Sequence, residues 1–224
     1  MKIFIGYDHR EDLAYQVCEY SVKKHQPQSD IRPLKQHELR ASGAYTRPED
    51  SLASTEFSIT RFLVPYLAGY KGWAVFCDCD FLFVDDLKHL FDLADPQYAV
   101  QCVKHEYVPK KLVKMDGMPQ YLYPRKNWSS LVLWNCAHPK NRELGPELVN
   151  TASGLFLHQF QWLADEDIGS LPIEWNWLVG WNQEPDDGAP RALHYTEGGP
   201  WFEQYRNCEY SAVWKQYLEE MLWK

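Results

Sequence analysis

Two aspartates between two apolar runs constrain this chain more than any other feature. Residues 73–77 read Trp-Ala-Val-Phe-Cys, residues 81–84 read Phe-Leu-Phe-Val, and Asp78-Cys79-Asp80 lies between them. The first run predicts a central strand that ends at the aspartates. Side chains at i and i+2 of an extended backbone point to the same side, so both carboxylates face one way. Burying them without a cation would be costly, so the pattern favours a bound ion over a solvated acidic loop.

Mg²⁺ and Mn²⁺ are the ions that such a pair of hard oxygen ligands suits. These ions usually keep coordination positions open for the phosphates of a substrate. Asp85 and Asp86 follow shortly afterwards, and we expect one of them to cap the turn into residues 87–93 rather than bind metal.

Strand and helix signals alternate along the chain. Residues 2–7 form a short apolar run that predicts a buried strand. Asp8 with Glu11 three residues later resembles a capping box, and helical spacing of apolar residues continues to about Lys24. Residues 38–54 are polar and predict a loop.

A second helix is expected to begin at Ser54 or Thr55, to kink at Pro65 and to end at Gly69. Further strands are predicted near residues 31–34, 98–103, 130–134, 173–178 and 191–195, and further helices over 142–152 and 208–223. This alternation favours an α/β sandwich with a mainly parallel sheet, whose ligands bind at the carboxyl ends of the strands. A length of 224 residues suits one domain, residues 1–224.

Charge and composition exclude several classes of protein. The net charge of -8 argues against a broad nucleic-acid-binding surface. No stretch approaches the roughly 18 apolar residues that a transmembrane helix needs, and the first apolar run is too short for a signal peptide. The six cysteines contain no Cys-x-x-Cys pair, so we expect reduced cysteines in a cytoplasmic protein.

Two later segments supply further candidate residues. His194 follows an apolar pair and is a candidate metal ligand, although a lone histidine is usually a packing or surface residue. Gly198-Gly199-Pro200 after it predicts a tight loop whose backbone can approach a phosphate closely. The cluster Asp165-Glu166-Asp167 is either an exposed acidic turn or a source of carboxylates for nucleophilic or acid/base chemistry.

Five elements in this order resemble a known family. They are Gly6-Tyr7-Asp8 at the end of the first strand, Arg61 in a helix before the next strand, Asp78-Cys79-Asp80, Asp165-Glu166-Asp167, and His-Tyr-Thr with Gly and Pro-Trp over residues 194–201. Their order resembles the family 8 glycosyltransferases and related bacterial, viral and plant enzymes. The similarity runs over about residues 2–201 and implies a GT-A type, Rossmann-like α/β/α sandwich.

The resemblance implies transfer of a sugar, a hexose in our expectation, from a nucleotide-diphosphate donor, for which we expect a UDP-sugar. It implies a metal, Mn²⁺ or Mg²⁺, held by Asp78, Asp80 and His194. Residues expected to contact the donor are Tyr7, Asp8, Arg61, Asp78, Cys79, Asp80 and Gly199, with Tyr7 and Asp8 at the base and ribose. Asp165 and Glu166 match an acidic segment of the family and are expected to be catalytic. The resemblance also implies retention of configuration, by a covalent or a front-face route, which the sequence leaves open.

Three departures from the family pattern matter. Gly199 stands where the family usually has a lysine, so a cationic phosphate contact is missing. Residues 128–131 read Trp-Ser-Ser-Leu where the family usually reads Asn-Ser-Gly-Val, so the identity of the sugar does not carry over. Glu166 is a carboxylate where the family has an amide.

Two alternatives and the acceptor stay open. A haloacid-dehalogenase-type phosphatase also has Asp-x-Asp at a strand end, but its motif usually opens the chain and is followed by Thr or Val, where this chain has Leu82. A non-catalytic module that binds a sugar nucleotide is consistent with the missing lysine. The acceptor, whether a glycan, a protein or a small molecule, has no sequence signal.

Overall fold

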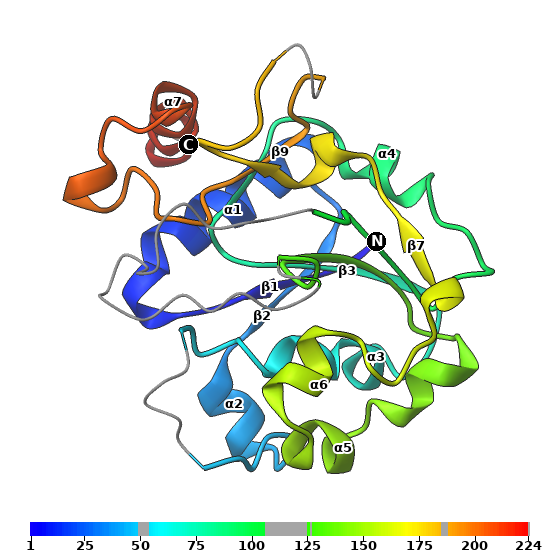
Figure 1. Cartoon of the computed structure of the whole chain (residues 1–224). Helices are drawn as coiled ribbons and strands as arrows, with labels where there is room; N and C mark the ends of the chain where they lie inside the picture. The colour runs from blue at the N-terminus through cyan, green and yellow to red at the C-terminus, as the bar shows by residue number, and fades with distance from the viewer. Residues whose placement is uncertain (49–53, 106–124, 126, 185–187, 224) are drawn as a thin grey trace.

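A six-stranded sheet crosses the middle of the molecule (Figure 1). The computed structural model describes residues 1–48, 54–105, 125, 127–184 and 188–223; residues 49–53 of the predicted loop lie outside this part. The strands follow the order β2-β1-β3-β6-β5-β7 and are β1 (Lys2–Gly6), β2 (Asp30–Leu34), β3 (Trp73–Cys77), β5 (Val100–Cys102), β6 (Leu131–Asn135) and β7 (Ile168–Ser170). Strand β6 runs antiparallel to both of its neighbours, and the other pairs are parallel. The prediction of a mainly parallel sheet is confirmed.

Helices cover both faces of this sheet. In Figure 1, α1 and α7 lie on one side, and α2, α3, α5 and α6 lie on the other. The helices are α1 (Asp12–His25), α2 (Gln36–Ala41), α3 (Val64–Leu67), α4 (Leu87–Phe91), α5 (Pro146–Thr151), α6 (Gly154–His158) and α7 (Ser211–Leu222). This arrangement is the predicted α/β/α sandwich. No helix in the described part of the chain is both long and apolar enough to span a bilayer.

A second, smaller sheet lies beside the first. It has the order β4-β9-β8, with β4 (Phe81–Phe83), β8 (Trp177–Leu178) and β9 (Ala192–His194). Buried side chains of this sheet pack with those of α1 and α7 in a cluster separate from the main core: Val17, Leu82, Trp177, Val179, Leu193, Tyr195, Trp214 and Tyr217. The small sheet therefore has its own apolar support on the α1–α7 side.

Three local predictions were wrong. Part of the expected loop forms α2, because Leu39 is buried against the main core. The expected long second helix is a series of turns followed by η2 (Thr60–Leu63) and the short α3. Pro65 lies in the first turn of α3, where its missing N–H costs nothing, instead of kinking a longer helix. The expected strand over 173–178 is mostly the short helix η5 (Ile173–Asn176), with only β8 extended.

Candidate metal centre

The Asp-Cys-Asp segment is the crossing point between the two sheets. The backbone N–H of Asp78 donates to the carbonyl oxygen of Ser130 at 2.9 Å, which extends the β3–β6 pairing by one residue. The carbonyl oxygen of Asp80 accepts from the N–H of Tyr195 at 3.0 Å, which begins the pairing of β4 with β9. The segment is therefore held by a different sheet at each end.

Strand register brings His194 to Asp80. Strands β4 and β9 pair Phe81 with His194, and the two rings stack with centroids 4.4 Å apart and planes 16° from parallel. Nε2 of His194 lies 3.4 Å from Oδ2 of Asp80. Together with Asp78, these residues offer three ligand atoms that all lie within 4.8 Å of one another. The structure thus brings together the three predicted metal ligands.

This donor set fits a hard or borderline divalent cation. Two carboxylate oxygens and one imidazole nitrogen suit Mn²⁺ or Mg²⁺. Neighbouring ligands on an octahedral ion at about 2.1 Å lie about 3 Å apart, close to the separation of Asp80 from His194. The side chains of Asp78, Asp80 and His194 are 15%, 18% and 2% exposed, so the group faces solvent only at the carboxylates.

Arg61 lies against Asp78. Its Nη1 is 2.7 Å from Oδ1 of Asp78 and donates to the carbonyl oxygen of Ser129 at 2.9 Å. The guanidinium also lies over the rings of Phe57 and Phe76, with centroid distances of 5.3 and 5.0 Å. A buried cation in this position fixes the rotamer of Asp78, so the predicted donor-binding arginine directly contacts a candidate ligand.

Tyr7 and Asp8 lie at the carboxyl end of β1. The Tyr7 hydroxyl donates to Asp12 at 2.9 Å. Asp8 is fully buried and accepts from the side chain of Arg10 and from the N–H of Glu56. Burial alone would raise the pKa of Asp8, but the hydrogen bonds from Arg10 and Glu56 outweigh it and lower the pKa. Contact of these two residues with a base or ribose stays a prediction.

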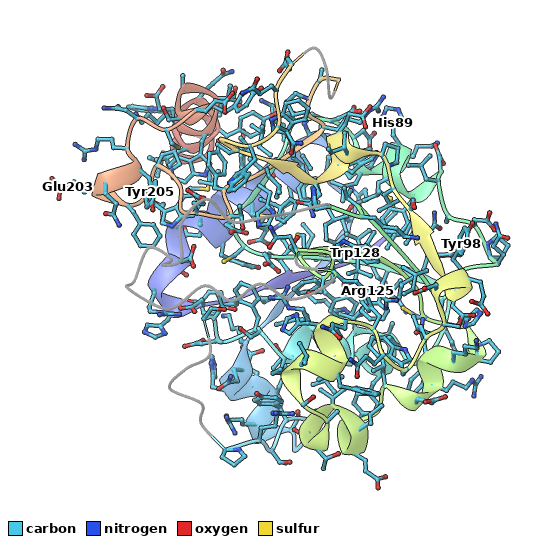
Figure 2. All side chains as sticks on the ribbon, viewed as in Figure 1. His89, Tyr98, Arg125, Trp128, Glu203 and Tyr205 are labelled. Carbon is cyan, nitrogen blue, oxygen red and sulfur yellow. The ribbon has the colours of Figure 1, made fainter. Side chains whose placement is uncertain are left out.

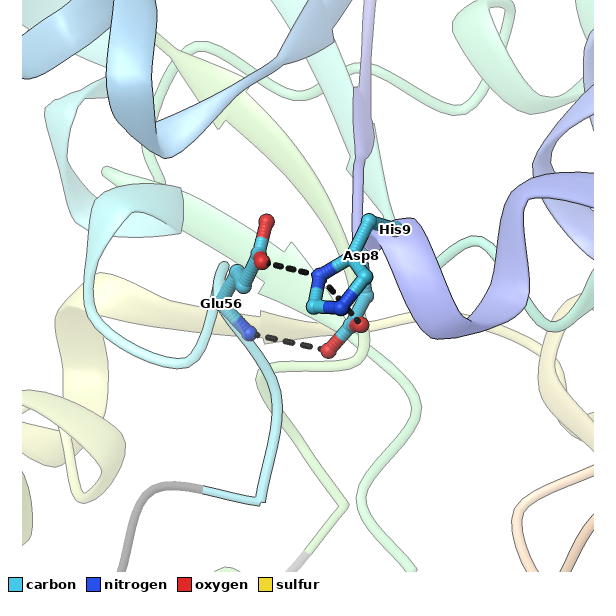
Figure 3. A group of neighbouring side chains, drawn as sticks. All are labelled: Asp8, His9 and Glu56. Atoms are coloured by element: carbon cyan, nitrogen blue, oxygen red, sulfur yellow. Dashed lines mark hydrogen bonds and ion pairs between the residues drawn. The ribbon is translucent and has the colours of Figure 1, made fainter. Parts of the chain in front are cut away.

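A second group of possible ligands, Asp8, His9 and Glu56, lies nearby (Figure 3). Nδ1 of His9 is 2.5 Å from Glu56 and 3.9 Å from Asp8. However, Arg10 makes two hydrogen bonds to the Asp8 carboxylate, so a metal ion would have to displace a guanidinium. We interpret this group as an ion-pair network.

The acidic cluster Asp165-Glu166-Asp167 forms η4 (Asp165–Asp167) before β7, whereas the Asp-Cys-Asp segment follows β3. Since β3 and β7 point the same way, the two segments lie at opposite ends of their strands. Asp167 pairs with Lys140 at 2.5 Å and accepts from the N–H of Ala164. In the described part of the chain, the cluster is not part of the group formed by Asp78, Asp80 and His194.

Asp165 is 87% exposed and forms an ion pair with Arg125. The Arg125 guanidinium lies 5.5 Å from the Trp128 ring, near the start of β6 (Figure 2). Arg125 therefore links η4 to the residues just before β6. The start of β6 pairs with the end of β3, where the two aspartates follow. The catalytic roles of Asp165 and Glu166 stay predictions.

Gly199 is required by its neighbour. A Cβ atom on Gly199 would lie 2.0 Å from the ring of Trp201. The lysine usual in the family that the sequence resembles therefore cannot occupy this position while Trp201 keeps its place. Only the backbone of Gly199 is available to a ligand.

Glu11 is a residue whose place near the site the sequence did not reveal. Its position suggested a capping box, and Asp8 does cap η1 (His9–Glu11) by accepting from the N–H of Arg10. Glu11 itself is 6% exposed, and its Oε2 has no hydrogen-bond partner among the described residues. Burial, followed by the charge of Asp80, raises the pKa of Glu11 to about 8.

A cavity of about 550 Å³ lies close to the candidate centre. It is lined by Val103, Lys104, His105, Ser170, Leu171, Ile173, Leu178, Trp181 and Asn182. Burial, followed by the charge of His194, lowers the pKa of His105 to about 4. Leu178, which lines the cavity, pairs with His194 in the register of β8 with β9. The cavity therefore extends from the vicinity of His194 to the ring of Trp181.

The sheet and the candidate centre at its edge define a glycosyltransferase fold of the GT-A type. Solved structures with this fold are similar to the chain along nearly its whole length. The bifunctional glycosyltransferase WbbM has a TM-score of 0.68 and 16% identity, over 99% of this chain and 51% of that one. GlyE of Streptococcus pneumoniae TIGR4 has a TM-score of 0.65 and 15% identity, over 99% of this chain and 61% of that one. The chain thus spans about half the length of the WbbM structure and about three fifths of GlyE.

The galactosyltransferase LgtC, solved with donor and acceptor sugar analogues, has a TM-score of 0.61 and 13% identity over 98% of this chain and 96% of that one. No family model matches the sequence. The chain belongs to the same family as Protein CDI of Arabidopsis thaliana. The two are 55% identical over 223 residues, which cover 98% of this chain and 86% of that protein.

Proposed function

We propose that this chain is a metal-dependent glycosyltransferase of the family 8 type. It moves a hexose from a nucleotide-diphosphate donor, for which we propose a UDP-sugar, to an acceptor, and it retains the anomeric configuration. The observation that carries the proposal is the group of Asp78, Asp80 and His194 at the edge of a GT-A sheet. The complex of LgtC with donor and acceptor sugar analogues supports a donor and an acceptor site in such a fold.

The three ligands would hold Mn²⁺ or Mg²⁺ at the diphosphate. A bound divalent cation neutralises the negative charge that develops on the leaving diphosphate. Arg61 keeps Asp78 in place for this role through its 2.7 Å ion pair. The Gly198-Gly199 backbone would approach the phosphates without a side chain, because Trp201 excludes one at Gly199.

The sugar carbon that loses its phosphate gains positive charge, which a nearby carboxylate stabilises. We propose Glu166 or Asp165 for this role, although η4 precedes β7 and so lies at the other end of its strand from the aspartates that follow β3. The ion pair of Asp165 with Arg125, which comes before β6, links η4 to that end of the sheet. The cavity beside His194 would receive the acceptor, since Trp181 offers a flat ring for a sugar and Lys104 and Asn182 offer polar groups. We propose that the protein acts in the cytoplasm.

Thermal shift and calorimetry with UDP-, GDP-, CDP- and dTDP-sugars test this proposal, each with Mn²⁺ and with EDTA. A donor present at 100 times its dissociation constant adds about 2.7 kcal/mol to the free energy of unfolding, which such assays detect readily. We expect one donor class to bind only with metal, and Asp80→Ala to abolish that binding. Equal donor affinity in EDTA, or in Asp80→Ala, would contradict the proposal.

Product analysis separates the alternatives. Release of nucleoside diphosphate together with a glycosylated acceptor or free sugar identifies a transferase. Release of inorganic phosphate would indicate a phosphatase instead. Metal-dependent donor binding without turnover would indicate a non-catalytic module, which the absence of a lysine at position 199 makes worth testing.

A further inference from the structure

A chain of hydrogen bonds leads away from the imidazole of His194. Its Nδ1 lies 2.8 Å from Oδ1 of Asn176, and Nδ2 of Asn176 donates to Oγ of Ser130 at 2.9 Å. The Ser130 hydroxyl donates to the carbonyl oxygen of Asn127 at 2.7 Å. Asn176 is 0% exposed and Ser130 is 4% exposed, so bulk water does not compete for these groups.

The carbonyl of Asn127 gives this chain of hydrogen bonds a single direction. A carbonyl only accepts, so Ser130 uses its one proton there and offers Asn176 only lone pairs. Asn176 must then point its NH₂ group at Ser130 and its oxygen at His194. That oxygen requires a proton on Nδ1 of His194.

The consequence reaches the candidate metal centre. A neutral imidazole carries one N–H, so a proton on Nδ1 leaves a lone pair on Nε2. Nε2 is the nitrogen that lies 3.4 Å from Oδ2 of Asp80. The lone pairs of Nε2 of His194 and Oδ2 of Asp80 then face each other at 3.4 Å, an arrangement that a cation bound between the two atoms stabilises.

Ser130 contacts residues on both sides of the candidate metal centre, namely Asp78 directly and His194 through Asn176. Its hydroxyl supports the Asn176–His194 pair, and its carbonyl accepts from the N–H of Asp78. It also occupies a position where the resemblance leads us to expect glycine. The hydroxyl that directs Asn176 is thus supplied by a residue at which this chain departs from the family pattern.

We propose that Ser130 and Asn176 are positioning residues that fix the tautomer of His194 and thereby raise the affinity of the centre for a divalent cation. The proposal rests on the metal centre of the proposed function. Partners that orient a metal-binding histidine typically change metal affinity 10- to 100-fold.

Nitrogen-15 NMR of the imidazole groups tests the tautomer directly. In the metal-free protein at pH 8, we expect His194 to carry its proton on Nδ1. In Ser130→Ala and Asn176→Leu we expect a mixture of tautomers. Calorimetric titration with Mn²⁺ alone should show affinity at least ~10-fold weaker in both variants.

Conservative and control variants separate positioning from general destabilisation. Asn176→Asp keeps an acceptor at Nδ1 of His194 and should keep near-native Mn²⁺ affinity. Ser21→Ala also removes a fully buried serine hydroxyl, one that donates to the carbonyl of Cys18 and accepts from the N–H of Phe83, and it should leave Mn²⁺ affinity unchanged. Ser130→Gly provides a second test if Ser130→Ala fails to fold.

A proton on Nε2 of His194 in the metal-free wild-type protein would overturn the proposal. Wild-type Mn²⁺ affinity in both Ser130→Ala and Asn176→Leu would also overturn it. A wild-type protein that binds no Mn²⁺ would overturn the metal centre of the proposed function instead, and the NMR measurement would still decide the tautomer.

Discussion

Glu11 makes the free energy of unfolding depend on pH, and the charge of Asp80 in the candidate centre contributes to this dependence. Its folded pKa of about 8 lies above the ordinary value of 4.5. Between these values the unfolded chain loses a proton that the folded protein keeps, so the free energy of unfolding falls as pH rises. The slope is at most about 1.4 kcal/mol per pH unit. His105, whose folded pKa of about 4 lies below 6.5, has the opposite effect and acts only below about pH 6.5.

We therefore predict that Glu11→Gln removes a fall in stability between pH 6.5 and 8. Glutamine keeps the shape of the side chain but has no proton to lose. Urea denaturation in EDTA at pH 6.5, 7.2 and 8.0 measures this, with the exposed Glu38→Gln as the control. An identical pH dependence in Glu11→Gln and in the wild-type protein would show that Glu11 is not protonated in the fold.

The sequence predicted the candidate ligands better than their supports. Asp78 and Asp80 follow an apolar run, which is visible locally. His194 entered through the order of motifs, because its contact with Asp80 depends on strand register. Asn176 is a polar residue flanked by Trp175 and Trp177, and this pattern suggests a buried polar group that needs a partner. That partner, His194, is 18 residues away in the sequence. No spacing rule reports such a contact.

At the scale of elements, direction and pairing were the hardest features to predict. The apolar run that became β6 carries no mark of its antiparallel direction, because a strand buried on both faces reads the same either way. The run at 81–84 was recognised as apolar, yet its place in a second sheet depends on β9, more than 100 residues later. Pro65 was expected to kink a longer helix, whereas it lies in the first turn of the short α3.

The loop after β9 yields a prediction about Gly199. Because a Cβ atom there would lie 2.0 Å from Trp201, we expect Gly199→Ala to lower the free energy of unfolding by about 1–3 kcal/mol. Gly154→Ala is the matched control, since its Cβ would meet Ile59 at an ordinary 3.6 Å. Thermal and urea unfolding measure both variants.

A double-mutant cycle identifies the cause. If the Trp201 ring is the obstacle, Gly199→Ala should cost much less in a Trp201→Ala background. Equal costs in the two backgrounds would show that Trp201 is not what requires glycine at this position.

The η4 segment allows catalysis and stability to be separated. We predict that Glu166→Gln lowers turnover by at least ~10²-fold, about 2.7 kcal/mol of transition-state stabilisation, with donor affinity within a few-fold and thermal stability unchanged. Asp167→Asn should instead lower thermal stability and leave turnover nearly unchanged, because Asp167 pairs with Lys140 and accepts from the N–H of Ala164. Steady-state kinetics and thermal unfolding of both variants, with Asp165→Asn as the comparison, decide the roles. Full activity of Glu166→Gln and Asp165→Asn together would show that the cluster is structural.

At the scale of the whole molecule, the question is whether the two apolar clusters unfold together. The main core contains Trp134, which is fully buried and stacks with Trp162 at 6.3 Å. The second cluster contains Trp214, which is 2% exposed. The Asp78–Asp80 segment joins their two sheets by a short covalent connection, and α1 contributes buried residues to both clusters. These shared elements favour one cooperative unit, as we expect if residues 1–224 form a single domain.

We predict that Trp134→Ala and Trp214→Ala lower the midpoint of the same single transition. Each removes a buried tryptophan, a change that typically costs 3–5 kcal/mol. Far-ultraviolet circular dichroism reports the helices and sheets, and tryptophan fluorescence reports both clusters, so the two signals should change together during urea unfolding of the wild-type protein and of each variant. Two independent domains would behave differently: Trp214→Ala would shift an early transition of the α1–α7 side and leave a second one at its wild-type midpoint. Because His194 lies in the small sheet and Asp78 follows the main sheet, such uncoupling would also separate the candidate metal ligands, and Mn²⁺ affinity would be lost at the first transition.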